Sequence, residues 1–332
     1  MHVRLPVTPA LRIGIDENGL GARLGPMVVT GVLARVHTDG VGQLTEPVPG
    51  ALARHLGDSK QLVSHRNVQL GEAWARVLVD SQCVCPNELW GKVSLDGTQE
   101  LTAPCPSHLI AQCWSDQGEK FEAQSDLVER VRGHREDLAA QGIEIVAVRA
   151  VALCSKRLNL GSAQGHHRFV MDLHQMERLV LALHALAGTE VHAVCGKVGG
   201  IHDYCRFFGP LAGRLRTVLV RSSAISAYRF PGLGELSFVR DADARDRLVM
   251  LASLVGKYLR ELLMSRIVRH YAQDLVEPVF PSGYHDPVTR RFVQASEWLR
   301  QRRAVPDTCF ERLGRCVSTA GDGSRRVPVL PG

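Results

Sequence analysis

The sequence predicts an α/β fold, in which helices cover the faces of a β-sheet. Near the start of the chain, two runs of alternating apolar residues flank a glycine-rich turn, which is typical of neighbouring strands. Further along, an amphipathic helical pattern passes directly into a short apolar strand, the order of elements in an α/β layer. A strand and a long helical pattern follow each other again in the last third of the chain.

The composition is that of a globular protein. A chain of 332 residues with 45% hydrophobic residues can bury a sizeable core, in one large domain with an insertion or in two domains. Disorder, a collagen-like repeat and a disulfide-stapled miniprotein are excluded. The nine cysteines are an odd number without a regular framework. Because no apolar run approaches the roughly 20 residues of a membrane span, and the start lacks a signal-peptide pattern, we expect a cytoplasmic protein without a membrane partner.

The first strand covers residues 11–16 and ends at Asn18-Gly19, and the second covers residues 25–36. The short connection between them predicts an antiparallel pair.

A helix follows the strands, and then the texture of the chain changes. Asp58 or Ser59 can cap a helix that opens near Lys60. Residues 80–141 have weak periodicity, several cysteines and three prolines. They predict an insertion or subdomain.

The second half supplies the longest helices. Residues 165–186 place their apolar side chains on one helical face, and the strand 191–196 follows directly. After another strand at 235–240, Asp243 opens a long helix that runs to about His270. A last helix is predicted from Thr289 to Arg303.

Two adjacent carboxylates, Asp16 and Glu17, lie at the end of the first strand. Neighbouring side chains on a strand point to opposite faces, so both can serve one site only where the strand ends in a turn, here at Asn18-Gly19. Hard cations such as Mg²⁺ prefer oxygen ligands of this kind. The alternative is a pair of solvated turn carboxylates.

Five short motifs follow one another along the chain. They are IGIDENGLGARLGPMVVTGVLA at 13–34, LGDSKQLVSHR at 56–66, KRLNL at 156–160, DADARDRLVMLASLVGKYLRE at 241–261 and SGYHDPVTRRFVQA at 282–295. In this order they resemble type 2 ribonuclease H (ribonuclease HII). The first resembles that family's opening signature, Gly-Ile-Asp-Glu-Ala-Gly-Arg-Gly, and the others resemble its Asp-Ser-Lys-x-Leu, Leu-Asn, Gly-Asp-Ala-Lys and Lys-Gly-Tyr segments.

The resemblance implies a ribonuclease H-like mixed sheet flanked by helices, with a Cys-containing insertion and a C-terminal helical extension. It also implies hydrolysis of RNA in RNA–DNA hybrids, or of ribonucleotides embedded in duplex DNA, with Mg²⁺ or Mn²⁺. The expected division is 1–79 with 142–270 as the catalytic-type domain, 80–141 as the insertion, 271–316 as a nucleic-acid-binding extension and 317–332 as a flexible tail. The end of the chain is rich in Arg, which suits phosphates or a solvated basic face.

Four acids hold two metal ions in this family. Carried over by position, Asp16, Glu17 and Asp243 supply three of them; the alternative for Asp243 is a helix N-cap, with Asp246 as a partner. The remaining position, where the family has Val-Asp-Gly, holds Cys195. Because a neutral thiol is a poor ligand for a hard cation, we expect impaired cleavage.

Two nearby residues are candidates to replace the missing fourth acid. Lys197, two residues further on, is expected to extend its ammonium into the same pocket in place of a cation. Asp203 is the other candidate, if the chain loops back after the strand.

Substrate contacts follow from the same resemblance. Leu20 stands where the family's turn has Arg, while the amides of Gly19 and Gly21 approach the phosphate and the 2′-hydroxyl. Lys60 contacts the nucleic-acid backbone. Tyr284 stacks on the deoxyribose beside the ribonucleotide; the alternative is an exposed loop tyrosine.

The insertion contains one further candidate, a zinc site formed by Cys83, Cys85, Cys105, His108 and Cys113. The Cys-x-Cys spacing is tighter than that of usual structural zinc sites. The alternative is a set of buried thiols.

Three functions remain open from the sequence. The first is an active ribonuclease HII-like enzyme, and the second is a degenerate homologue that binds hybrid duplex or a protein partner without cleavage. The third is an interaction protein whose partner surface lies in residues 80–141. We expect a monomer.

Overall fold

The computed structural model describes residues 10–108, 112–198, 201–272, 274–275, 277 and 279–313. These residues form a seven-stranded mixed sheet with the strand order β3-β2-β1-β4-β7-β6-β5. β1 pairs antiparallel with β2 and parallel with β4, and β4 pairs parallel with β7. The strands are β1 (Ala10–Asn18), β2 (Met27–Val36), β3 (Ile143–Leu153), β4 (Val191–Gly196), β5 (Thr217–Arg221), β6 (Ile225–Phe230) and β7 (Gly234–Val239).

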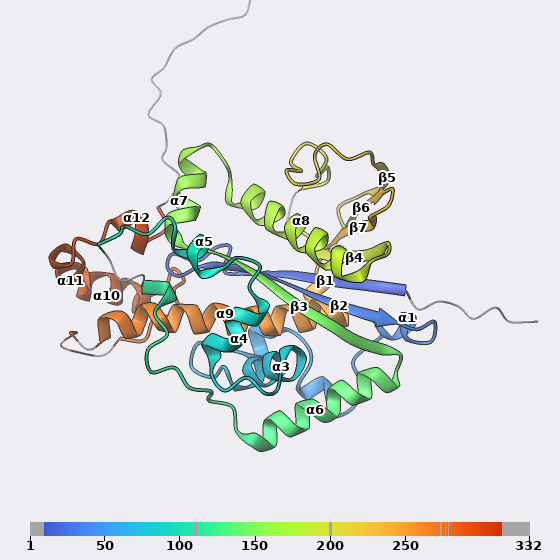
Figure 1. Cartoon of the computed structure of the whole chain (residues 1–332), viewed down its shortest axis with the longest axis horizontal. Coiled ribbons are helices and arrows are strands. Elements are labelled where there is room, and N and C mark those ends of the chain that lie inside the picture. Colours follow the sequence, from blue (N-terminus) through green and yellow to red (C-terminus); the bar gives the residue numbers. More distant parts are fainter. Residues whose placement is uncertain are drawn as a thin grey trace, which may run out of the picture.

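Helices cover both faces of this sheet (Figure 1): α8 lies on one face, and α9 lies on the other together with α3, α4 and α6. The longer helices are α3 (Gln69–Val79), α4 (Pro86–Val93), α6 (Ser125–Ala140), α7 (Ser155–Ala163), α8 (Arg168–Ala187), α9 (Arg247–Ala272), α10 (Pro287–Ala295) and α11 (Glu297–Arg302). The short ones are α1 (Gly40–Gln43), α2 (Ser59–Leu62), α5 (Thr98–Thr102) and α12 (Asp307–Phe310). The predicted α/β class, a mixed sheet flanked by helices, is confirmed.

The alternation of side chains along β1 separates two cores. Ile13 and Ile15 are buried against the apolar stripe of α8, which includes Leu179. On the opposite face, Gly14 lets α9 approach the sheet, because a Cβ on Gly14 would lie 2.5 Å from the backbone nitrogen of Val249. A larger residue at this position would push α9 off the sheet, and the side chains that α9 presents to the end of β1 would move with it.

Several elements differ from the expectation. Between the predicted strands 191–196 and 235–240 the chain also forms the β5–β6 hairpin, and β3 was not predicted from the sequence. The single helix predicted from Thr289 to Arg303 is two helices, because the chain turns at Ser296, where the hydroxyl donates to the carbonyl of Phe292 at 2.8 Å. No described helix combines the length and the apolar character that crossing a bilayer requires.

Residues 80–141 share the core on the α9 face. Trp90 of α4 and Leu138 of α6 are buried in the same cluster as Leu259 of α9. Buried Glu72 of α3 accepts backbone hydrogen bonds from Glu122 and Ala123 at 2.8 and 2.9 Å, which fixes the loop that leads into α6. The division of the chain into an insertion and a catalytic-type domain stays a prediction.

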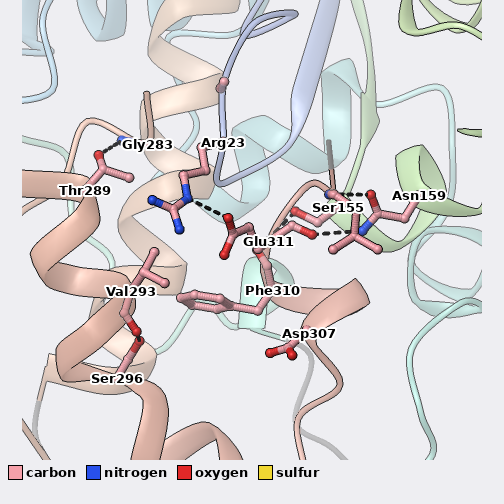
Figure 2. Close-up of polar contacts among 12 residues, drawn as sticks. Arg23, Ser155, Asn159, Gly283, Thr289, Val293, Ser296, Asp307, Phe310 and Glu311 are labelled. Carbon is pink, nitrogen blue, oxygen red and sulfur yellow. Dashed lines mark hydrogen bonds and ion pairs between the residues drawn. The ribbon is translucent and has the colours of Figure 1, made fainter. Parts of the chain in front are cut away.

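The C-terminal segment folds back onto the connection between β1 and β2 (Figure 2). Arg23 of that connection forms a 2.5 Å ion pair with Glu311, and Ser155 and Asn159 of α7 donate to backbone carbonyls within α12 and directly after it. Phe310 of α12 is buried beside Val293 of α10. The segment is therefore part of the folded body; the tail predicted at 317–332 lies outside the described residues.

Candidate active site

The carboxyl ends of β1 and β4 lie side by side, because these strands are parallel and Ile15 is paired with Cys195. Asp16 and Glu17 follow Ile15 directly. By alternation, Asp16 points to the α9 face and Glu17 to the α8 face. Open α/β sheets bind their ligands at such carboxyl ends. The predicted pair of acids is thus at the edge of the sheet where a site is expected.

Asp16 is a buried acid with only 9% of its surface exposed, and it forms no ion pair with a described cationic side chain. Its pKa is raised from 3.8 to about 8, mainly by burial and in part by the charges of Glu17 and Asp243, while the Ser253 hydroxyl opposes the shift. A Cβ on Gly196 would lie 3.0 Å from Asp16 Oδ1, so glycine at the end of β4 leaves room for the carboxylate. An unpaired buried carboxylate favours any cation that can reach it.

Glu17 is tied to the glycine-rich turn. The backbone N–H of Leu20 donates to its Oε2 at 3.0 Å. Burial raises the pKa of Glu17, whereas that hydrogen bond and the positive charges of Lys60 and Arg312 lower it. The carboxylate therefore has one fixed oxygen and lies within the field of basic residues around the turn.

Asp243 does not open α9, and that prediction is wrong. It lies in the 3-10 turn Ala242–Ala244, whereas Asp246 caps the helix by accepting from the backbone N–H groups of Leu248 and Val249 at 2.9 and 3.1 Å. Asp243 instead accepts a 3.2 Å hydrogen bond from the ammonium of Lys60.

Lys60 is brought to the site by the short helix α2, as expected. Asp58 caps this helix by accepting from the Lys60 N–H at 2.9 Å, and the hydroxyls of Ser59 and Ser253 are 2.8 Å apart. Because Ser253 belongs to α9, this contact anchors α2 next to Asp16. The Lys60 side chain remains 76% exposed and free to meet a ligand.

Cys195 is fully buried on the α8 face of the sheet. Burial and the nearby acids Asp172 and Asp16 raise the pKa of its thiol well above the ordinary value, so it stays neutral. The position thus supplies no ligand for a hard cation.

Neither of the two expected replacements reaches the pocket. The Lys197 ammonium donates to the Ser222 carbonyl at 3.0 Å and to the Ser226 hydroxyl at 2.6 Å, which holds it on the β5–β6 hairpin. Asp203 forms an ion pair with Arg221 at 3.3 Å. Both expectations are wrong because the hairpin, not anticipated from the sequence, provides closer partners.

Asp172 is the acid that sequence reasoning missed. It lies on α8, is fully buried, and neither carboxylate oxygen has a hydrogen-bond partner among the described residues. Burial raises its pKa well above the ordinary value, and the charges of Glu17 and Asp16 raise it further. The helical pattern does predict that Asp172 is buried. It lies four residues before Met176, on the same side of the helix as the apolar residues that face the sheet.

Two buried arginines, Arg260 and Arg312, contact the glycine-rich turn. Gly19 has φ +92°, and a Cβ there would lie 2.6 Å from Arg260 Nε, whereas Gly21 has open space around it. Buried Arg312 of the C-terminal segment donates to the carbonyls of Gly19, Leu20 and Gly25. Arg312, almost 300 residues away in the sequence, thus shapes the backbone of the turn.

Two cationic side chains lie over the ring of Tyr284, beside the turn. The guanidinium of Arg260 is 4.5 Å from the centre of its ring, and the ammonium of Lys257 is 5.5 Å away. Cations over an aromatic face fix its orientation. The half-buried ring is therefore positioned rather than loose.

The candidate zinc ligands of residues 80–141 are not brought together. Cys83 is buried in the α9-side core, whereas Cys113 packs in the C-terminal cluster with Cys154. As the side chains stand, no three described His, Cys, Asp or Glu residues are arranged to hold a metal ion. This includes the acids around β1, whose like charges favour separation when no cation is present.

No protein-family model matches the chain, and no curated protein sequence matches it. Solved structures similar to it include ribonuclease HII of Archaeoglobus fulgidus in complex with PCNA, at 16% identity over 95% of this chain and 98% of that one, with a TM-score of 0.41. Ribonuclease HIII from Bst with Mn²⁺ has 12% identity over 92% and 67%, with a TM-score of 0.44. Ribonuclease H2 of Pyrococcus horikoshii OT3 has 15% identity over 91% and 92%, with a TM-score of 0.39.

The residues present fit a hard divalent cation. Asp16 and Asp172 are buried acids that form no ion pair with a described cationic side chain. The charge of Glu17 acts on both of them, and the charge of Asp243 acts on Asp16. Oxygen donors of this kind suit Mg²⁺ or Mn²⁺ rather than a soft metal.

Proposed function

We propose that the chain is a divergent ribonuclease HII-like endoribonuclease. It hydrolyses phosphodiester bonds in the RNA strand of RNA–DNA hybrids, or at ribonucleotides embedded in duplex DNA, with Mg²⁺ or Mn²⁺. The observation that carries the proposal is the position of buried Asp16 at the end of β1, where the charges of Glu17 and of Asp243 in the turn before α9 both act on its carboxyl group. Residues 227 positions apart in the sequence thus contribute to one acidic site.

Each acid has a distinct place in this proposal. Asp16, Glu17 and Asp243 would hold the cations between the two faces of the sheet. When bound, divalent cations lower the pKa of water and stabilise the charge on a leaving oxygen. Lys60, whose ammonium is exposed, binds a phosphate of the substrate and releases Asp243 as it does so.

The turn and the loop around Tyr284 would select the substrate. The fixed backbone at Gly19 and Gly21 presents amides to the scissile phosphate and to the 2′-hydroxyl, which distinguishes RNA from DNA. The ring of Tyr284, held by Arg260, offers a flat surface for the neighbouring sugar.

A second candidate function is binding of hybrid duplex or of a protein partner without cleavage. It is favoured by two observations: the neutral thiol of Cys195 at a ligand position, and the ion pair of Asp243 with Lys60. In this case the affinity still depends on the 2′-hydroxyl and on salt, because the turn and the basic residues are intact.

The test is cleavage of a duplex with a single ribonucleotide, in Mg²⁺ and in Mn²⁺. The variants are Cys195→Asp, Asp16→Asn and, as a control cysteine outside the site, Cys85→Asp. We expect Cys195→Asp to raise the rate, Asp16→Asn to abolish cleavage, and Cys85→Asp to leave it unchanged. Rapid cleavage by the unaltered chain with no effect of Cys195→Asp would contradict the assignment of the missing ligand. Binding that requires the 2′-hydroxyl, with no cleavage by any variant, would favour the second function.

A further inference from the structure

We infer that Asp172 of α8 is a ligand for a divalent cation and supplies the carboxylate that position 195 lacks. The inference rests on the proposed function, since it concerns the same acidic site. The inference adds to the proposed function that one metal ligand comes from helix α8 and not from strand β4.

Asp172 faces the position of the missing ligand. Val191, Ala193 and Cys195 alternate into the core on the α8 face, where Met176 of α8 also lies. Asp172 is one helical turn before Met176 on the same side of the helix. Asp172 and Cys195 are both fully buried, and the charge of Asp172 raises the pKa of the Cys195 thiol.

The acids of β1 act on Asp172 electrostatically. Glu17 follows Ile15 by two residues and lies on the α8 face by alternation. Burial raises the pKa of Asp172, and the charges of Glu17 and Asp16 raise it further. The Asp172 carboxyl therefore lies within the field of the acids at the end of β1.

The environment of Asp172 leaves its oxygens unsatisfied. A buried polar group without a partner costs about 1 to 3 kcal/mol, and an ionised one costs more. Protonation removes the charge but still leaves an acceptor without a donor. A cation shared with Glu17 satisfies both requirements, because it pairs the charge and occupies the lone pairs.

Another buried acid on the same helix shows the contrast. Glu177 is also fully buried, but its carboxylate accepts hydrogen bonds from the backbone N–H of Gly209 at 3.2 Å and of Leu211 at 2.7 Å. It is a structural anchor for the loop after β4. Glu177 is therefore a matched control, because it lies on the same helix and is equally buried, but its carboxylate has hydrogen-bond donors.

The experiment measures Mn²⁺ binding without nucleic acid, by titration calorimetry and by the electron paramagnetic resonance signal of free Mn²⁺. It compares the unaltered chain with Asp172→Asn, Glu177→Gln, Asp16→Asn and the double variant Asp172→Asn/Cys195→Asp. We expect Asp172→Asn to weaken binding at least about tenfold. The double variant should restore it, because the carboxylate returns to β4. Glu177→Gln should leave it unchanged.

Thermal melting distinguishes loss of a ligand from loss of the fold. Without metal, Asp172→Asn should melt above the unaltered chain, because an uncompensated buried acid is removed, and it should lose most of the Mn²⁺-induced increase in melting temperature. If Asn is not tolerated, Asp172→Ala is measured in the same way. Unchanged Mn²⁺ affinity in the Asp172 variants, together with a loss in Asp16→Asn, would overturn this inference and leave the proposed function standing. If the unaltered chain binds no Mn²⁺, both are wrong.

Discussion

Replacing Asp16 with Asn should make the metal-free protein more stable, and increasingly so as the pH rises. The carboxyl group of Asp16 has a pKa of about 8 in the folded chain, against 3.8 when it is solvated. Between these values the folded state holds a proton that the unfolded state has released, so the free energy of unfolding falls as pH rises. The contribution is fully present below about pH 4 and is lost on passing through about pH 8.

The slope of this effect is set by one proton. It amounts to about 1.4 kcal/mol per pH unit, so the difference between the variant and the unaltered chain should reach several kcal/mol at pH 8. Asn cannot ionise, which removes the dependence. Urea unfolding with EDTA at pH 5, 6, 7 and 8 measures it directly. Stability curves that run parallel for the two proteins would show that Asp16 is not an uncompensated buried acid, and the account of the site would lose its electrostatic basis.

Three further substitutions test the surroundings of the site. Lys60→Ala should change the free energy of unfolding by less than about 0.5 kcal/mol, since its ion pair is exposed. It should lower the number of ions released on hybrid binding by about one, as measured by fluorescence anisotropy at several salt concentrations. Gly19→Ala should cost about 1 to 3 kcal/mol in chemical denaturation because of its positive φ, and Gly21→Ala, with open space, should cost almost nothing; equal costs would refute the role of the turn. Arg312→Met should lower stability by about 2 kcal/mol or more, because buried carbonyls lose their donor, whereas the exposed control Arg290→Met should not; calorimetry separates them.

Local patterns were sufficient for the elements that lie next to each other in the sequence. The strands around the glycine-rich turn, the helix α8 and the strand β4 were predicted because each carries its own periodicity. β3 was missed because its burial does not alternate cleanly; its place depends on pairing with β2, more than a hundred residues earlier. The β5–β6 hairpin was missed for a related reason, since every residue of β5 is exposed and the strand has no buried face to mark it.

The candidate site divides in the same way. Asp16, Glu17 and Asp243 were found because their local motifs resemble a known family. Asp172 and Arg312 were not, because their roles depend on contacts with residues 155 and 293 positions away, Glu17 and Gly19. Only packing reveals that one acid lacks a partner and that one arginine holds the turn.

The arrangement of acids on both faces of β1 has a consequence for the whole fold. Asp16 and Asp243 are on the side of α9, whereas Glu17 and Asp172 are on the side of α8. Burial disfavours the charged forms of Asp16 and Asp172, and the neighbouring acids add to this, so ionising either carboxyl group lowers the stability of the metal-free protein. A cation bound by all four acids would connect the α8 side and the α9 side of the sheet at one site. Stability and metal binding are then linked, and the free energy that the fold loses to these buried acids is recovered when the ion binds.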